Sequence, residues 1–212
     1  MADAGGNSLL LVDEGGVVSF IAGWEPMMVE FTAEQLAAMG PPPGEEAELP
    51  ATEGEAPAEG EAPPAGEGAS LPVEAVPTSV VVGPDGALYV GQLTGGPFPP
   101  GAASVWRVVP GEDPTQYATG FTNIIDIGFG ADGTLYVAEI VHDGLISVFA
   151  GGAAPIGALL SVPPGGGEAQ PLVTGEQLMS PGGLAVAEDG SVYVSTGTLS
   201  PPGGGALVKI TP

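Results

Sequence analysis

The sequence predicts an all-β chain that repeats a unit of short antiparallel strands, and two observations carry this prediction. Three Asp-Gly dipeptides each stand between short runs of apolar and β-branched residues. Asp-Gly in that setting is the strongest short-range signal for a β-hairpin. A further apolar segment follows each hairpin, and a copy of it also occurs near the start of the chain. Because 43% of the residues are hydrophobic, we expect the chain to fold in spite of its 37 glycines and 24 prolines.

The hairpins supply the first two strands of the unit, A and B. They cover residues 80–90, 125–137 and 184–194, with turns at Asp85-Gly86, Asp132-Gly133 and Asp189-Gly190. A tyrosine occupies the same place in each strand B, and the three tyrosines are 47 and 57 residues apart: Tyr89, Tyr136 and Tyr193. Recurrence at one position of a repeat indicates core packing, so we expect these rings to be buried.

Strands C and D complete the unit. Strand C recurs at 7–15, 103–111, 157–165 and 205–212, and a shorter strand D recurs at 17–22, 116–119 and 170–174. The order A–turn–B–loop–C–turn–D, with a period of roughly 40–50 residues, is typical of a blade of a β-propeller. These segments make 13 strands, or about three blades, which is too few to close a ring, so we expect an open arc.

The blades divide the chain into segments. Strands C and D of a truncated first blade fall in residues 1–30, and two whole blades fall in 79–120 and 121–178. Strands A, B and C of a last blade fall in 179–212, and residues 31–78 interrupt the repeat.

The interruption combines a predicted short helix with an acidic insert. Thr32 and Gln35 have the spacing of a capping box before the run 36–39, and Gly40-Pro41 ends the helix. Residues 40–70 hold 8 Glu, 7 Pro, 7 Ala and 6 Gly in 31 positions. Such a sequence cannot bury apolar surface and its charges repel one another, so we predict an extended, disordered and dispensable insert.

An antiparallel meander sorts the connections onto two faces. The tight Asp-Gly turns and the C–D turns share one face, and the B–C loops share the other with the D–A crossings. The B–C loops are long and varied, at 93–102, 141–156 and 197–204, and the acidic insert is itself a D–A crossing. Loops carried on a rigid scaffold are where function concentrates, so we expect the B–C loops to form the binding face.

Composition excludes several classes of protein. Two basic residues against 26 acidic ones give a net charge of −24, which leaves no cluster for binding nucleic acid or an acidic membrane surface. No apolar run is long enough for a membrane-spanning helix. Cysteine is absent, which excludes disulfides and thiolate sites.

Several segments resemble one family of propellers. Residues 78–95 followed by Pro97-Phe98-Pro99, together with 117–126 and 3–7, are similar to the ScyD/ScyE family of NHL-like β-propeller proteins. The resemblance extends over nearly all of the chain except 31–70, and it implies a secreted or periplasmic protein. This sequence differs from the family in carrying the acidic insert and in lacking N-terminal blades and a signal peptide, so we expect the natural start to lie upstream. The resemblance supplies no catalytic residue.

Asn123 is the one candidate metal ligand, and a weak one. Calcium-dependent lactonase-like propellers, which this chain resembles in its hairpins, use an asparagine at a similar place. Calcium takes six to eight oxygen ligands, and the positions aligned with Asn123, Ser79 and Gly182, contribute little. We therefore favour the alternative that Asn123 bonds to the loop backbone, with no cofactor.

Three other ionisable residues have structural and functional interpretations. Asp126 lies within an apolar strand A, where a carboxylate needs partners, so we expect it to bond to the backbone of the neighbouring blade. Glu139 and His142 lie at the end of a strand B and in its loop, where a single histidine is usually solvated. No Ser-His-Asp constellation is visible, so the sequence favours a non-enzymatic role.

Three functions stay open. The first is an extracytoplasmic propeller that binds an unknown protein or small molecule on the B–C loop face. The second is a calcium-dependent hydrolase or lactonase that uses Asn123, and the third is a truncated gene fragment without a function of its own. Unpaired strand edges and apolar blade faces at the two ends of the arc also lead us to expect self-association.

Overall fold

In the residues that the structure describes, the protein is all-β apart from two short helices. The computed structural model describes residues 1–39, 68–149 and 152–212. Its residues group into two units, one of residues 1–27 and 73–212 and the other of residues 28–72. Each unit is described by itself below.

The larger unit contains four antiparallel sheets in chain order. The first sheet is β1 (Ala2–Asp3), β2 (Ser8–Val12) and β3 (Val18–Gly23). The second is β6 (Pro77–Val82), β7 (Leu88–Gln92), β8 (Ala103–Val108) and β9 (Thr115–Phe121). The third is β10 (Ile124–Phe129), β11 (Leu135–Glu139), β12 (Ile156–Val162) and β13 (Gln170–Met179), and the fourth is β14 (Gly183–Val186), β15 (Val192–Thr196) and β16 (Ala206–Ile210).

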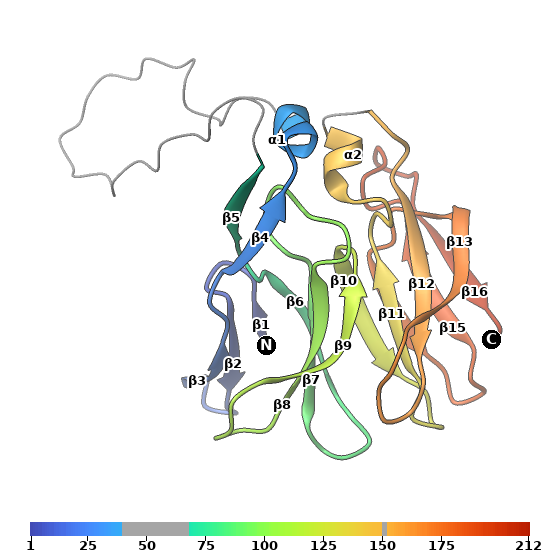
Figure 1. Cartoon of the computed structure of the whole chain (residues 1–212). Helices are drawn as coiled ribbons and strands as arrows, with labels where there is room; N and C mark the ends of the chain where they lie inside the picture. Colours follow the sequence, from blue (N-terminus) through green and yellow to red (C-terminus); the bar gives the residue numbers. More distant parts are fainter. Residues whose placement is uncertain (40–67, 150–151) are drawn as a thin grey trace. The chain divides into compact units, whose positions relative to one another are not determined.

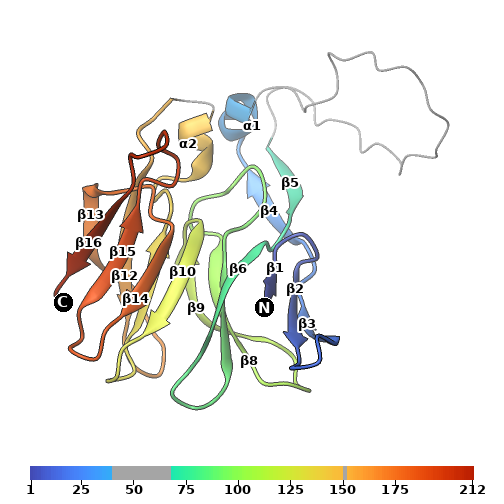
Figure 2. The ribbon, with the colours of Figure 1, turned by 180° about the vertical axis from the view of Figure 1, so that it is seen from behind.

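The sheets stand in a row as successive blades. The innermost strand of the third sheet, β10, contacts β6 of the second sheet and β14 of the fourth, and β1 contacts β6. Figure 2 shows these strands together on one side of the row, with the later strands of each sheet behind them. The first and fourth sheets lie at opposite ends in both views (Figures 1 and 2), so the predicted arrangement of blades in an open arc is confirmed.

Alternating apolar side chains make the contacts between neighbouring sheets. Tyr89, Phe121 and Leu135 belong to the core between the second and third sheets, and Tyr136, Leu159 and Val192 to the core between the third and fourth. Tyr89 is 4% exposed and Tyr136 is 6% exposed, which confirms the predicted burial, whereas Tyr193 is only half-buried. Period-two alternation places one face of each strand against each neighbouring blade, and this is why the middle strands β7, β11 and β12 are apolar on both faces.

The Asp-Gly turns close each hairpin at one end of the blades. Gly86, Gly133 and Gly190 have positive φ angles of 81°, 86° and 82°, which the turn requires and which glycine adopts without steric cost. The preceding aspartate accepts a hydrogen bond from the backbone N–H two residues later at all three turns. We call this end the turn face, and the opposite end, formed by loops 93–102, 141–156 and 197–204, the loop face (Figure 1).

The sequence did not predict every element. Strand β1 adds an inner strand to the first sheet, and α2 (Leu145–Phe149) forms within the loop 141–156. The strand β4–β5 pair of the smaller unit was not predicted either. These are short elements whose hydrogen bonds depend on neighbours in space, so local sequence pattern does not mark them.

The smaller unit contains the predicted helix. Strands β4 (Met27–Phe31) and β5 (Ala69–Val73) pair with each other, and α1 (Ala33–Met39) follows β4. The capping box is present: the Thr32 N–H donates to Gln35 Oε1 at 2.8 Å, and the Gln35 N–H donates to Thr32 Oγ1 at 3.2 Å. The predicted disorder of 40–70 falls mostly on 40–67, outside the described residues, and residues 69 and 70 lie in β5.

Neither helix in the described part of the chain has the length and apolar character that would let it cross a membrane.

Candidate functional site

The loop face is held together by buried polar side chains at the ends of strands. Asn123, between β9 and β10, is fully buried and has a positive φ of 51°. Its side-chain Nδ2 donates to the backbone oxygen of Leu93 at 2.9 Å, and its Oδ1 accepts from the backbone N–H of Leu145 at 2.8 Å. One carboxamide thus joins the loop 93–102 to the loop 141–156 at the start of α2.

This bonding bears on the calcium interpretation of Asn123. The carboxamide oxygen that a calcium ion would need is the atom that accepts the Leu145 bond. Within the described residues, no three His, Asp or Glu side chains gather as a group that could hold a metal ion. The favoured interpretation, in which Asn123 bonds to the loop backbone, agrees with these contacts. Calcium ligation stays the alternative, and a calorimetric titration of the protein with calcium tests it.

The register of the sheets corrects the positions that correspond to Asn123 in the other blades. Gln92 and Glu139 each lie three residues after the tyrosine of their blade, and they pair with Pro77 and Ile124 respectively. The equivalents of Asn123 are therefore Val76 and Ser180, and the expected equivalents, Ser79 and Gly182, were wrong. The same three positions lie nine residues before the turn aspartates Asp85, Asp132 and Asp189, so the sequence itself carries this alignment. A β-bulge at the same place in β6 and β10 leaves the count unchanged. Asn123, Val76 and Ser180 share a positive φ, which indicates one common backbone corner.

A second buried group on the loop face is Glu139, at the end of β11. Its side chain is only 1% exposed, with Oε1 accepting the Thr122 backbone N–H at 2.7 Å and Oε2 lying 2.5 Å from His142 Nδ1. Burial raises the pKa of Glu139 above its ordinary value, and the hydrogen bond with His142 opposes that shift. The His142 side chain is 44% exposed, so the pair connects a buried carboxylate with a solvent-facing ring.

The Glu139–His142 pair limits the chemistry of this face. A carboxylate that orients an imidazole is part of a general-base arrangement, but such a base must also reach a nucleophile. In the described residues no hydrogen bond joins the His142 ring to a hydroxyl group. What the structure shows is that the pair connects the end of β11 to the first residues of the loop 141–156.

Glu139 belongs to a row of buried polar residues that was not predicted from the sequence. Gln92, Glu139 and Thr196 each lie three residues after the blade tyrosine and are 2%, 1% and 9% exposed. Gln92 Oε1 accepts bonds from Trp106 Nε1 at 2.9 Å and from the Ser104 N–H at 3.2 Å. The repeat itself carries this signal, since a polar residue recurs at one blade position.

Asp126 was expected to bond to the backbone of the neighbouring blade, and it does so. Its Oδ2 accepts the backbone N–H of Leu184 in the fourth sheet at 2.8 Å, and its Oδ1 accepts the Ile127 N–H at 2.9 Å. Burial raises the pKa of Asp126, and the two backbone hydrogen bonds oppose the shift. The predicted bond to the neighbouring blade is confirmed, and it ties β10 to β14.

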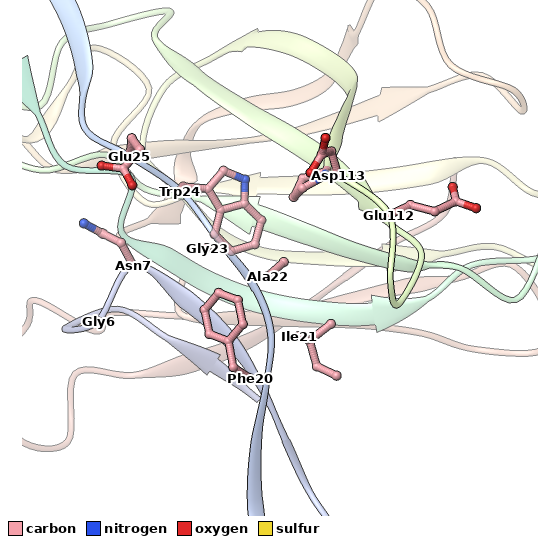
Figure 3. Close-up of a pocket in the computed structure, with 11 residues that line it drawn as sticks. Gly6, Asn7, Phe20, Ile21, Ala22, Gly23, Trp24, Glu25, Glu112 and Asp113 are labelled. Carbon is pink, nitrogen blue, oxygen red and sulfur yellow. The ribbon is translucent and has the colours of Figure 1, made fainter.

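A cavity of about 450 Å³ lies between β3 of the first sheet and the β8–β9 connection of the second, and we call it the flank pocket. Figure 3 shows the rings of Phe20 and Trp24 near its centre, with Glu25 at one end and Glu112 and Asp113 at the other. Its lining includes no residue of the three loops that form the loop face. Because Phe20 is 69% exposed, the flank pocket belongs to an open apolar surface more than to an enclosed site.

Comparison with known proteins adds no identity. A scan against models of protein families finds no match to this chain, and no curated protein sequence matches it.

Proposed function

We propose that this chain is a partner-binding scaffold of the ScyD/ScyE propeller type, and that it binds a protein partner with its loop face. The observation that supports the proposal most is Phe149, at the end of α2, whose side chain is 64% exposed. The centroid of its ring lies 6.1 Å from that of Phe98, which belongs to the neighbouring loop. Exposed aromatic side chains on an ordered surface are typical anchors of protein interfaces.

The hydrogen bonds beneath α2 make this anchor rigid. Asn123 holds the first residue of the helix, and buried Val141 and Leu145 pack with Phe98 beneath it. Gly144 lies so close to Pro100 and to the Phe98 backbone oxygen that a side chain at 144 would press on both. A loop ordered before binding loses less conformational entropy when a partner binds, which favours affinity.

Site-specific photo-crosslinking tests the proposal. A benzoylphenylalanine at position 149, incubated with extract of the source cells, is expected to give a discrete crosslinked species. The control places the same group at Val82, which is 62% exposed at the turn-face end of β6. The partner captured in the crosslinked species is then identified, purified on its own and titrated with the wild-type chain and with Phe149→Ser. We expect Phe149→Ser to bind this partner at least about tenfold more weakly than the wild type does.

Two results would contradict the loop-face proposal. Equal crosslinking at positions 149 and 82 would indicate nonspecific contact. Unchanged affinity of Phe149→Ser for the captured protein would show that Phe149 is no anchor.

We also propose that isolated copies of the chain associate through the outer face of the first sheet. That face exposes Val12, Val18 and Phe20 at 47%, 57% and 69%, and it continues into the flank pocket. Net charge of −24 opposes association, but salt screens it over a Debye length of about 8 Å at physiological ionic strength. Light scattering at two salt concentrations is expected to report larger particles at the higher one, and Phe20→Ser is expected to reduce them. A monomer of 20.7 kDa at both salt concentrations overturns this.

The location outside the cytoplasm is a proposal that rests on the family resemblance alone. The gene sequence upstream tests both the location and the family resemblance. An in-frame extension that encodes a signal peptide and further Asp-Gly hairpins supports both. An upstream stop codon in the same frame, with no such hairpins, contradicts them.

A further inference from the structure

A second cavity, of about 430 Å³, lies on the turn face between the third and fourth sheets, and we call it the turn pocket. Its lining combines carboxylates, hydroxyls and apolar side chains: Asp132, Thr134, Tyr136, Ser161, Leu172 and Asp189. Asp132 and Asp189 belong to the Asp-Gly turns of two neighbouring blades. The turn pocket is separate from the loop face and plays no part in the function proposed above.

In the preceding blade, the residues at the corresponding positions contact a basic side chain. At the turn of the second sheet, Asp85 Oδ2 lies 2.7 Å from Arg107 Nε and also accepts a long bond of 3.4 Å from the Tyr89 hydroxyl. Arg107 pairs with Tyr89 across β7 and β8. An aspartate, a tyrosine and a strand C cation thus form one constellation, and the cation lowers the pKa of Asp85.

The fourth sheet repeats the constellation with a different cation. Lys209 pairs with Tyr193 across β15 and β16, its Nζ lies 5.5 Å from the Tyr193 ring centroid, and it reaches Asp189 Oδ2 at 3.7 Å. Arg107 and Lys209 are the only two basic residues of the chain besides its single histidine. Both therefore occupy the same position of their blades.

The third sheet has the aspartate and the tyrosine without the cation. Tyr136 pairs with Ser161, so a serine stands where the other two blades have Arg107 and Lys209. By the same register Leu172 stands in the place of Tyr117. Two large side chains of the preceding junction are replaced by smaller ones, and this accounts for the turn pocket.

We propose that the turn pocket binds an alkylguanidinium group, the chemistry of an arginine side chain, supplied by another molecule. Asp132 Oδ2 accepts the Thr134 hydroxyl at 2.9 Å and would accept from the guanidinium with its second lone pair, as Asp85 Oδ2 accepts from both Tyr89 and Arg107. The apolar surfaces of Tyr136 and Leu172 would cover the aliphatic stem. Asp132 and Asp189 outnumber the neighbouring Lys209, so the charge of the turn pocket favours a cation. Planar guanidinium suits the carboxylate and the tyrosine ring better than a compact ammonium does.

A titration followed by amide NMR tests this with N-acetyl-arginine amide as the probe and uncharged N-acetyl-norleucine amide as the control. We expect shift changes at residues 132–134 and at Ser161, with a dissociation constant on the order of millimolar for such an open ion pair. Asp132→Asn is expected to weaken binding at least about fivefold. The matched variant Glu188→Gln removes one charge from the next turn without lining the turn pocket, and it is expected to bind as the wild type does.

Ser161→Arg is the decisive variant because it supplies the cation from the chain itself. It is expected to keep the wild-type spectrum elsewhere, to raise the melting temperature and to abolish binding of the probe. The peptide acetyl-Ala-Arg-Ala-amide distinguishes the sources: tighter binding than the single residue supports a partner polypeptide, and equal binding supports a free alkylguanidinium compound. An equal response to N-acetyl-arginine amide and to N-acetyl-norleucine amide overturns the proposal. Equal weakening of arginine binding by Asp132→Asn and by Glu188→Gln overturns it as well.

Discussion

The turn face and the loop face of the same blades are stabilised over very different sequence distances. At the turn face each aspartate bonds to a backbone N–H two residues away, at Asp85, Asp132 and Asp189 alike. At the loop face Asn123 bonds to Leu93 and Leu145, 30 and 22 residues away, and Glu139 bonds to Thr122, 17 residues away. The backbone of each turn is therefore held mainly by a local motif, whereas the loops of the loop face are joined by bonds between distant residues. A change at the loop face should consequently cost more than a comparable change at the turn face.

The largest expected effect is that of Asn123→Ala. It removes two buried hydrogen bonds to the backbone and puts alanine at a φ of 51°, so we expect a loss of about 3 kcal/mol in the free energy of unfolding. Urea unfolding measures it. Asn123→Gly, which relieves the backbone strain but not the lost bonds, should recover only about 1 kcal/mol. A change below about 0.5 kcal/mol for the alanine variant would mean that the loops are not joined here.

The next effect concerns pH at Glu139. Burial raises its pKa in the folded chain above the ordinary value of 4.5, so the folded state binds this proton more tightly than the unfolded state does. As pH rises from 4.5 through the raised pKa, the wild type should lose stability relative to Glu139→Gln, which keeps the acceptor for Thr122 but carries no charge. Urea unfolding across this range, with Glu188→Gln as the exposed control, measures the difference. If the difference in free energy of unfolding between wild type and Glu139→Gln is the same at every pH in this range, the expectation is contradicted.

A smaller effect is expected at the turn face from Gly86→Ala. The position has a φ of 81°, and no other group lies within 4 Å of the place of a Cβ atom, so only the backbone conformation opposes the change. We expect a loss of about 1 kcal/mol in thermal or urea unfolding. A loss as large as that of Asn123→Ala would remove the contrast between the two faces.

The smallest effect is expected from Arg107→Gln. The side chains of Arg107 and Asp85 are 36% and 39% exposed, so solvent and salt screen their attraction. The melting temperature should change less than for Gly86→Ala, and the difference should shrink as salt is added. A larger loss that persists at high salt would show that this pair contributes more than a surface ion pair does.

The repeated blade and its turns could be predicted from the sequence because their determinants are local. Asp-Gly with flanking apolar residues specifies each hairpin, and Thr32 with Gln35 specifies the start of α1. The burial of Tyr89 and Tyr136 followed from their recurrence at one place in the repeat. Even the bond from Asp126 to the next blade could be anticipated, since a carboxylate among apolar residues needs a donor.

Only the tertiary structure decided which distant groups meet. The two hydrogen-bond partners of Asn123 lie in other loops, 30 and 22 residues away. Glu139 and His142 are close in sequence, yet their pairing depends on the burial of Glu139 beneath a loop that Thr122 helps to fix. The turn pocket likewise depends on register, because Ser161 matters only when it stands where two other blades place a cation. A hydrogen bond between neighbours in the chain is set by their spacing, whereas one between distant residues is set by the packing of the sheets that carry them.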